Sequence, residues 1–244
     1  MGHDNLSPIR IGTAGWAIPR AVAERFPTEG TGLQRYAARF NAAEINSTFY
    51  RSHRPGTLAR WAETTPGDFA FAVKAPKAVT HERRLVDCED LLDRFLGEIA
   101  ELGSKLGPVL VQLPPKLDFD AAAAEAFFGQ LRERFDGPVA FEPRHPTWFG
   151  PEADAVLAAR HIARVAADPA CVPAATAPGG WPGLAYWRLH GSPRMYWSPY
   201  SPADLDALAT QMAEAPGERW CVFDNTGSGA AAANALDLAR RMAR

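Results

Sequence analysis

The sequence predicts an α/β fold, a single (β/α)8 TIM-type barrel that occupies residues 1–244 as one domain. Short apolar runs rich in Val, Ile and Phe alternate with helical patterns along the chain. No low-complexity linker separates two cores, and 244 residues suit a barrel of roughly 250 residues. Strands separated by helices imply right-handed crossovers and a parallel sheet. Repeated units of this kind close more readily as a barrel than as an open sheet.

The strands are expected where the apolar runs are short, as in strands buried on both faces. In chain order these runs cover residues 9–13, 42–46, 69–74, 109–113, 139–142, 163–167, 185–189 and 220–224.

The segments between these runs carry helical spacing of apolar residues, most clearly at residues 87–106. Asp118 or Asp120 is expected to cap an Ala-rich helix that ends at residue 135, and Ser201 is expected to cap the helix at residues 202–213. The other expected helices cover residues 33–40, 57–63, 154–161 and 229–241.

The connection after the sixth expected strand is irregular. Residues 169–183 are rich in Pro and Gly, which excludes a regular helix. We expect a long loop that lies over the mouth of the site.

Polar side chains follow the apolar part of almost every expected strand. Residues two apart on a strand share one face. Three such pairs are Glu44 with Asn46, Glu142 with Arg144, and Arg188 with His190. Because barrel enzymes carry their chemistry at the C-terminal strand ends, the pattern predicts a site there. The alternative is that these buried charges only pair with one another.

Five of the polar residues could transfer protons, and we expect them to be catalytic: Glu44, Lys74, Glu142, His190 and Asp224. Lys74 ends an apolar strand, where desolvation lowers the pKa of a lysine and favours a general base or a Schiff-base former. A nearby Glu44 or Asp224 would oppose that shift and make Lys74 an ion-pair partner. The sequence leaves both roles open.

A second set of residues is expected to bind a small anionic ligand, such as a phosphate ester. Arg144 and Arg188 can hold phosphate or carboxylate with two hydrogen bonds each. The turn from Gly227 to Gly229 can offer backbone N–H groups before a helix. The full expected set is Asn46, Tyr50, His81, Gln112, Arg144, His145, Asp168, Arg188, Asn225, Gly227 and Gly229.

The sequence requires no cofactor, and we assign no metal ligands. A divalent metal is the alternative, held by Glu142, Asp168, His190 and Asp224. The neighbouring arginines compete with it, because a guanidinium pairs with carboxylates. The three cysteines are widely spaced without a CxxC motif, which argues against disulfides and against a cysteine zinc site.

The net charge and the hydropathy pattern limit the classes of partner that we expect for this protein. The formal net charge of −2 gives no strong overall field for nucleic acid or membranes. Residues 1–10 lack an apolar signal core, and no apolar stretch approaches the ~18 residues of a membrane helix. We therefore expect a cytoplasmic protein without a membrane partner. The oligomeric state is left open.

Several motifs together resemble the YecE-like family, a domain of unknown function. They are GTAGW at residues 12–16, EINSTFYR at 44–51, FAFAVKAP at 69–76, QLPP at 112–115, EPRH at 142–145, RLHG at 188–191 and FDNT at 223–226. The resemblance spans nearly the whole chain. It implies a single (β/α) barrel and no particular reaction.

The leading functional hypothesis is an enzyme that acts on a small anionic substrate by acid–base chemistry. The first alternative is a barrel that binds or processes nucleic acid, including an endonuclease-like one that uses a metal, because basic and aromatic residues gather in the expected mouth loops. The second alternative is a non-catalytic scaffold that keeps only the fold.

Overall fold

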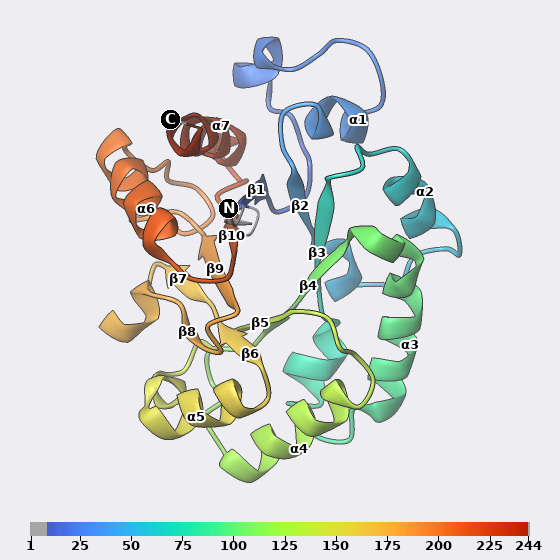
Figure 1. Ribbon diagram of the computed structural model, residues 1–244, viewed down its shortest axis with the longest axis vertical. Coiled ribbons are helices and arrows are strands. Elements are labelled where there is room, and N and C mark those ends of the chain that lie inside the picture. The colour runs from blue at the N-terminus through green and yellow to red at the C-terminus, as the bar shows by residue number, and fades with distance from the viewer. Residues whose placement is uncertain (1–8, 244) are drawn as a thin grey trace, which may run out of the picture.

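The computed structural model describes residues 9–243, and expectations about residues 1–8 lie outside that range. All eight expected strand regions contain strand (Figure 1). The strands are β1 (Ile9–Thr13), β2 (Ala42–Ile45), β3 (Ala70–Lys74), β4 (Leu106–Gln112), β5 (Val139–Glu142), β6 (Ile162–Arg164), β7 (Ala166–Asp168), β8 (Gly179–Gly180), β9 (Leu184–Leu189) and β10 (Glu218–Phe223).

Helices lie around the outside of the strands in Figure 1. Asp120 and Ser201 cap their helices as expected, each accepting a hydrogen bond from a backbone N–H three residues later. The helices are α1 (Gly32–Ala37), α2 (Thr57–Glu63), α3 (Glu89–Ile99), α4 (Ala121–Arg132), α5 (Pro151–Ala159), α6 (Pro202–Glu214) and α7 (Ala230–Met242). Short 3₁₀ and π turns are η1 (Arg20–Arg25), η2 (Ser47–Phe49), η3 (Ala78–Glu82), η4 (Ala100–Lys105), η5 (Pro146–Phe149) and η6 (Pro173–Thr176).

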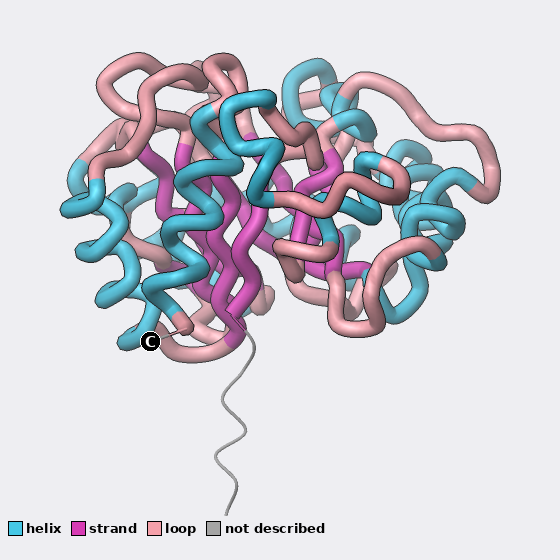
Figure 2. The backbone as a smooth tube through the Cα atoms, turned by 90° about the horizontal axis from the view of Figure 1, so that it is seen from above, coloured by secondary structure: helices cyan, strands magenta, loops and turns pink. Residues whose placement is uncertain are grey.

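Backbone pairing divides the strands into two sheets, ordered β1-β10-β9-β7 and β2-β3-β4-β5-β6-β8. Every neighbouring pair is parallel except β6 with β8. The chain is therefore an α/β fold with two mainly parallel sheets. Figure 2 shows the strands in the middle of the molecule with helices on either side. The single ring of continuous pairing that the sequence predicts is not present within residues 9–243.

Side chains replace backbone pairing where β1 faces β2. The Tyr36 hydroxyl accepts a hydrogen bond from the Thr13 N–H at 2.8 Å and donates one to the Ala42 carbonyl at 3.1 Å. The Asn41 side chain also bonds to the backbone of β1. These side chains satisfy polar groups that a β-ladder would pair, so the two strands meet in a single backbone bridge.

The other boundary between the sheets lies at Val165, between β6 and β7. The first half of this segment pairs with β5, and the second half pairs with β9. The expected strand at residues 163–167 is thus two short strands that belong to different sheets. One continuous stretch of backbone therefore links the sheets at this point.

The Pro- and Gly-rich connection does not form one long loop over the mouth. It contains η6 and β8, and β8 pairs antiparallel along β6. The Arg164 guanidinium fills the space beside Gly179, where an added Cβ would lie 2.2 Å from a guanidinium nitrogen. The next residue, Gly180, has a φ of 66°, and an added Cβ there would lie 2.6 Å from the Ile162 carbonyl oxygen, so glycine is required where this segment packs against β6.

The space between the two sheets is filled by apolar side chains that point inward. Small residues such as Ala42, Ala72 and Ala140 lie there together with larger apolar and aromatic side chains. Tyr186 and Trp220 stack within it, with ring centroids 6.1 Å apart and planes 5° apart. Side chains on the outer strand faces, including Trp187, belong to the larger apolar cluster that packs under the helices. The inner cluster forms the floor of the candidate site.

No helix within residues 9–243 is long and apolar enough to cross a membrane.

Candidate functional site

The polar residues of the site lie one layer above the inner apolar cluster. Period two along a strand places each of them on the inner face, two residues after an apolar member of that cluster. The residues positioned in this way are Glu44, Lys74, Gln112, Glu142, Arg188 and Asp224.

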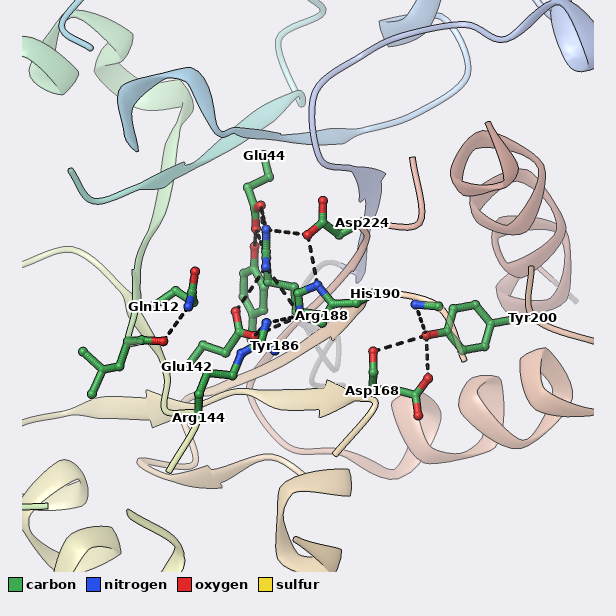
Figure 3. Close-up of polar contacts among 12 residues, drawn as sticks. Glu44, Gln112, Glu142, Arg144, Asp168, Tyr186, Arg188, His190, Tyr200 and Asp224 are labelled. Atoms are coloured by element: carbon green, nitrogen blue, oxygen red, sulfur yellow. Dashed lines mark hydrogen bonds and ion pairs between the residues drawn. The ribbon is translucent and has the colours of Figure 1, made fainter. Parts of the chain in front are cut away.

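Arg188 lies at the centre of a buried ion cluster (Figure 3). Its guanidinium is 2.7 Å from Glu44 Oε1, 3.3 Å from Glu142 Oε2 and 3.0 Å from Asp224 Oδ2. The Tyr186 hydroxyl donates to Glu44 Oε2 at 2.9 Å. All five side chains are buried, so each charge depends on its partners rather than on water.

His190 joins this cluster through both ring nitrogens. Nδ1 lies 3.0 Å from Asp224 Oδ2, and Nε2 lies 2.9 Å from Glu142 Oε1. Arg144 Nη2 is 2.7 Å from the same Nε2. A protonated Nε2 donates to Glu142, and an unprotonated Nε2 accepts from Arg144. Nε2 of the imidazole therefore has a hydrogen-bond partner whether or not it carries a proton.

Burial and charge act in opposite directions on the buried carboxyls. Burial by itself raises the pKa of Glu142, but Arg144 and Arg188 outweigh it and hold that pKa well below its ordinary value. Burial likewise raises the pKa of Asp224, and Arg188 together with His190 lowers it to below the ordinary value. Both groups are carboxylates at neutral pH.

Lys74 lies near the cluster without an ion pair. No carboxylate within residues 9–243 lies within 4.0 Å of its Nζ, which sits 4.2 Å from the centroid of the Phe49 ring. The residue is 9% exposed. Burial, with a further contribution from Arg188, lowers the pKa of Lys74 against the opposing effect of the carboxylates. The ion-pair role that the sequence left open is not the one observed.

A second imidazole lies on the Lys74 side of the site. His81 is part of the π-helical turn η3, and its ring is 5.1 Å from the Phe49 ring. Burial and Lys74 both lower the pKa of His81. Tyr50 packs edge-on against Phe49 and is 79% exposed. The Phe49 ring therefore contacts His81, Lys74 and Tyr50, and these three side chains surround it.

Asp168 lies apart from the cluster (Figure 3). Its Oδ2 accepts a hydrogen bond from the Tyr200 hydroxyl at 2.6 Å, and that hydroxyl accepts one from the Gly191 N–H at 2.8 Å. Asp168 lines a cavity of about 350 Å³ shared with Trp187 and α6, on the outer side of β7. Its carboxylate ties a loop to a strand end and lies outside the ion cluster, whereas its backbone carbonyl accepts the N–H of His190 at 2.7 Å.

In the expected anion-binding turn, the N–H groups of both glycines already donate to backbone carbonyls. The Gly227 N–H donates to the Tyr196 carbonyl at 2.9 Å, and the Gly229 N–H donates to the Thr226 carbonyl at 3.0 Å. Asn225 is buried and donates to neighbouring carbonyl and amide oxygens. These groups hold the turn together, so neither glycine N–H is free for a ligand.

The remaining expected residues have local partners. Gln112 donates to the Leu113 carbonyl at 2.5 Å, and His145 accepts from the Thr147 N–H as the cap of η5. Asn46 lines a cavity beside β2 that Glu44 also lines, and its buried Oδ1 has no hydrogen-bond partner among residues 9–243. Neither Gln112 nor His145 bonds directly to the ion cluster.

Two tyrosines belong to the site although the sequence did not single them out as site residues. Tyr186 lies two residues before Arg188, so the same period-two argument could have placed it on the inner face. Tyr196 lies in a loop, with its ring edge-on to His190 at 5.5 Å. Its positive φ of 64° is backbone strain of a kind that collects at functional sites. No periodic pattern locates a loop residue in this way.

Residues 9–243 contain no group of three or more His, Cys, Asp or Glu side chains that could hold a metal ion. In the cluster the carboxylates face Arg144 and Arg188 instead. All three cysteines are free thiols.

The family is decided by a match over nearly the whole chain. A family model described as "Protein of unknown function DUF72" matches residues 10–244. The chain belongs to this family. Within DUF72, the UPF0759 protein YecE of Escherichia coli K12 is 34% identical over 142 residues, which cover 58% of this chain and 50% of YecE. The UPF0759 protein YunF of Bacillus subtilis is 28% identical over 149 residues, or 59% of this chain and 53% of YunF. The matched region spans about half the length of these relatives.

Solved structures of DUF72 proteins share the fold. One from Thermotoga maritima superposes with a TM-score of 0.80 and 26% identity, covering 97% of this chain and 99% of its own. One from Enterococcus faecalis has a TM-score of 0.81 and 20% identity, with coverages of 97% and 96%. A more distant neighbour is 3-keto-D-glucoside 4-epimerase, YcjR, from E. coli, with a TM-score of 0.54, 16% identity and coverages of 97% and 100%. At such identities the last two show the fold alone.

Proposed function

We propose that this DUF72 protein is an enzyme that moves protons on a small anionic substrate at the C-terminal ends of its strands. We further propose that its two sheets are the halves of a (β/α)8-type barrel, with the ion cluster at the mouth. The observation that carries the proposal is Lys74. Lys74 is a buried amine with a lowered pKa, and it makes no ion pair within residues 9–243. It lies beside a cluster that contains both carboxylates and arginines.

The roles follow from exposure and partners. Arg144 pairs with Glu142, but its side chain is 12% exposed whereas that of Arg188 is 2% exposed, so Arg144 is the arginine of the cluster that a substrate anion can reach. Neutral Lys74 removes a proton from the substrate. His190, held by Asp224 through Nδ1, carries the second proton. Glu44 and Arg188 are buried in their mutual pair and support the site electrostatically.

Proton exchange at a carbon beside a carbonyl fits these roles. YcjR is named a 3-keto-D-glucoside 4-epimerase, and epimerisation beside a ketone removes a proton and returns it to the other face. That neighbour supports only a shared architecture. The support for the reaction class comes from an amine and an imidazole that approach one inner face from different strands.

The experiment is solvent deuterium exchange, followed by NMR, on a panel of keto sugars and keto acids that carry carboxylate or phosphate. We expect exchange by the wild type, and a loss of about 100-fold or more in Lys74→Met. Lys77→Met is the matched control, because Lys77 is exposed and pairs with Glu82 at 3.4 Å. His145→Ala serves the same purpose for His190→Asn. The proposal would be overturned if the Lys74→Met variant and the His190→Asn variant each exchanged deuterium as fast as the wild type.

An alternative proposal, binding of single-stranded nucleic acid, is favoured by the loops at the mouth. The Arg194 guanidinium lies 4.6 Å from the centroid of the Trp197 ring, and both Trp197 and Tyr50 are exposed. Such binding must weaken steeply as salt rises. Oligonucleotide affinity that is flat between 50 and 200 mM salt, roughly the range over which such contacts respond, would reject it. A non-catalytic scaffold would show neither deuterium exchange nor salt-dependent binding of oligonucleotides.

A further inference from the structure

A cavity of about 840 Å³ opens beside the C-terminal ends of β1 and β2. Its lining includes Glu44 of the ion cluster but neither Lys74 nor His190, so it adjoins the proposed proton-transfer site without containing the two groups that transfer protons there. Among its lining side chains are Asn46, Ser47, Arg51, His53, Arg54 and Trp61.

A serine, a histidine and a glutamate form a relay at this cavity. Ser47 Oγ lies 2.9 Å from His53 Nε2, and His53 Nδ1 lies 2.8 Å from Glu98 Oε1. Ser47 and His53 face the cavity, whereas Glu98, on α3, stands behind the imidazole. This order of nucleophile, base and orienting carboxylate is the one that activates a serine hydroxyl.

The relay is held in place from both ends. The side chains of His53 and Glu98 are only 7% and 14% exposed, and Glu98 Oε1 also accepts the backbone N–H of His53 at 2.8 Å. Glu98 keeps the proton of the imidazole on Nδ1, which leaves the Nε2 lone pair toward Ser47. Thr48 anchors the turn that carries Ser47 by donating to the Lys74 carbonyl at 2.7 Å.

The rest of the cavity supplies the other needs of an acyl-transfer site. The Asn46 Oδ1 is buried and has no hydrogen-bond partner within residues 9–243, and the NH2 group of the same side chain is the donor that we assign to a developing oxyanion beside Ser47. Trp16 and Trp61 pack edge-on at 4.8 Å and give an apolar wall. Arg51 and Arg54 line the same space and favour a substrate that carries negative charge.

We propose that this cavity is a second catalytic site, a serine esterase site for carboxylic esters with an anionic group. Ser47 Oγ attacks the ester carbonyl carbon while its proton passes to His53 Nε2. The bond to the leaving alkoxide breaks, and the alkoxide takes that proton and departs as an alcohol. Water then attacks the acyl-serine with His53 as base, which releases the carboxylic acid and returns the proton to Ser47.

The test uses the full chain with a fluorophosphonate probe and two substrates, p-nitrophenyl acetate and the mono-p-nitrophenyl ester of adipate. We expect the probe to label Ser47, located by mass spectrometry of tryptic peptides. After subtraction of the rates without enzyme, we expect faster hydrolysis of the adipate ester than of the acetate. Ser47→Ala should abolish labelling and lower hydrolysis about 100-fold or more. Glu98→Gln, a change at the positioning residue, should lower kcat while KM stays close to the wild-type value.

Ser52→Ala is the matched control, because Ser52 lines the same cavity and takes no part in the relay. Circular dichroism shows whether each variant is folded, and Ser47→Cys keeps a nucleophile and should be alkylated at this position by iodoacetamide. Folded wild type that is not labelled at Ser47, or hydrolysis that persists in folded Ser47→Ala, would overturn the proposal. Because Lys74→Met leaves the relay intact, esterase activity in that variant separates this site from the proton-transfer site.

Discussion

At the scale of single residues, one arginine decides whether the centre of the molecule is stable. Arg188 is the shared partner of Glu44, Glu142 and Asp224, and all of them are shielded from water. Burial lowers the pKa of Arg188, but the carboxylates outweigh it and hold that pKa well above its ordinary value. Removing one member leaves the others charged and without compensation.

Arg188→Met is therefore expected to destabilise the fold by about 3–5 kcal/mol, because it leaves buried carboxylates without a positively charged partner. Urea unfolding measures the loss. Arg240→Met is the matched control, since Arg240 pairs with Asp237 on the exposed surface of α7 and should change little. An Arg188 variant as stable as this control would contradict the assignment.

The same cluster predicts how stability depends on pH. The pKa values of Glu142 and Asp224 are lowered from 4.5 and 3.8, so their contribution is fully present above those ordinary values. It is lost as the pH falls through the lower values of the folded state. The urea concentration at the unfolding midpoint should decrease as the pH is lowered below about 5. Arg144→Met should weaken that pH dependence, because it removes one cause of the lowered pKa of Glu142. An unchanged slope in Arg144→Met would argue against it.

At the scale of elements, the boundary between β1 and β2 depends on side chains rather than on a ladder. The buried Tyr36 hydroxyl stands between the two strands. Gly12 permits this approach, because an added Cβ there would lie 2.1 Å from the Ala42 carbonyl oxygen. The strands can meet closely only while that position has no side chain.

Tyr36→Phe should cost about 1–3 kcal/mol, because it leaves a buried N–H and a buried carbonyl without their partner. Tyr50→Phe is the matched control, since Tyr50 is largely exposed and makes no such bridge. Thermal unfolding of the two variants gives the comparison. If the two variants have the same melting temperature, the Tyr36 hydroxyl does not stabilise the boundary between β1 and β2.

At the scale of the whole molecule, the candidate site also fastens the two sheets together. Glu44 and Glu142 come from one sheet, and Arg188 and His190 follow the other. The contacts that shape the site therefore cross between sheets that share little backbone pairing. Lys74, in contrast, contributes no ion pair to this connection within the described residues.

Stability and activity should consequently separate in two variants. Glu142→Gln is expected to lower both the melting temperature and the proton-exchange rate, because it removes a charge that crosses between the sheets. Lys74→Met should lower the exchange rate and leave the melting temperature nearly unchanged. Calorimetry measures the melting temperature of each variant, and the NMR assay measures its exchange rate. Equal losses of stability would show that Lys74 is also structural.

Much of this arrangement follows from the sequence by itself. Period-two patterning decides which strand residues point inward, and it correctly brings Glu44, Glu142, Arg188 and Asp224 together. Capping chemistry is equally local, so the starts of α4 and α6 were predictable. The family motifs also identify DUF72, because they are spread over almost the whole chain.

Tertiary structure alone decided the rest. Only the packed chain shows that Tyr36 interrupts the pairing of β1 with β2, that backbone carbonyls already occupy the N–H groups of Gly227 and Gly229, and that Glu98 stands behind His53. These outcomes depend on contacts between residues distant in sequence or on loop backbone without a period. Local patterns determine which face a side chain occupies, whereas the identity of its partner is settled only when the faces meet.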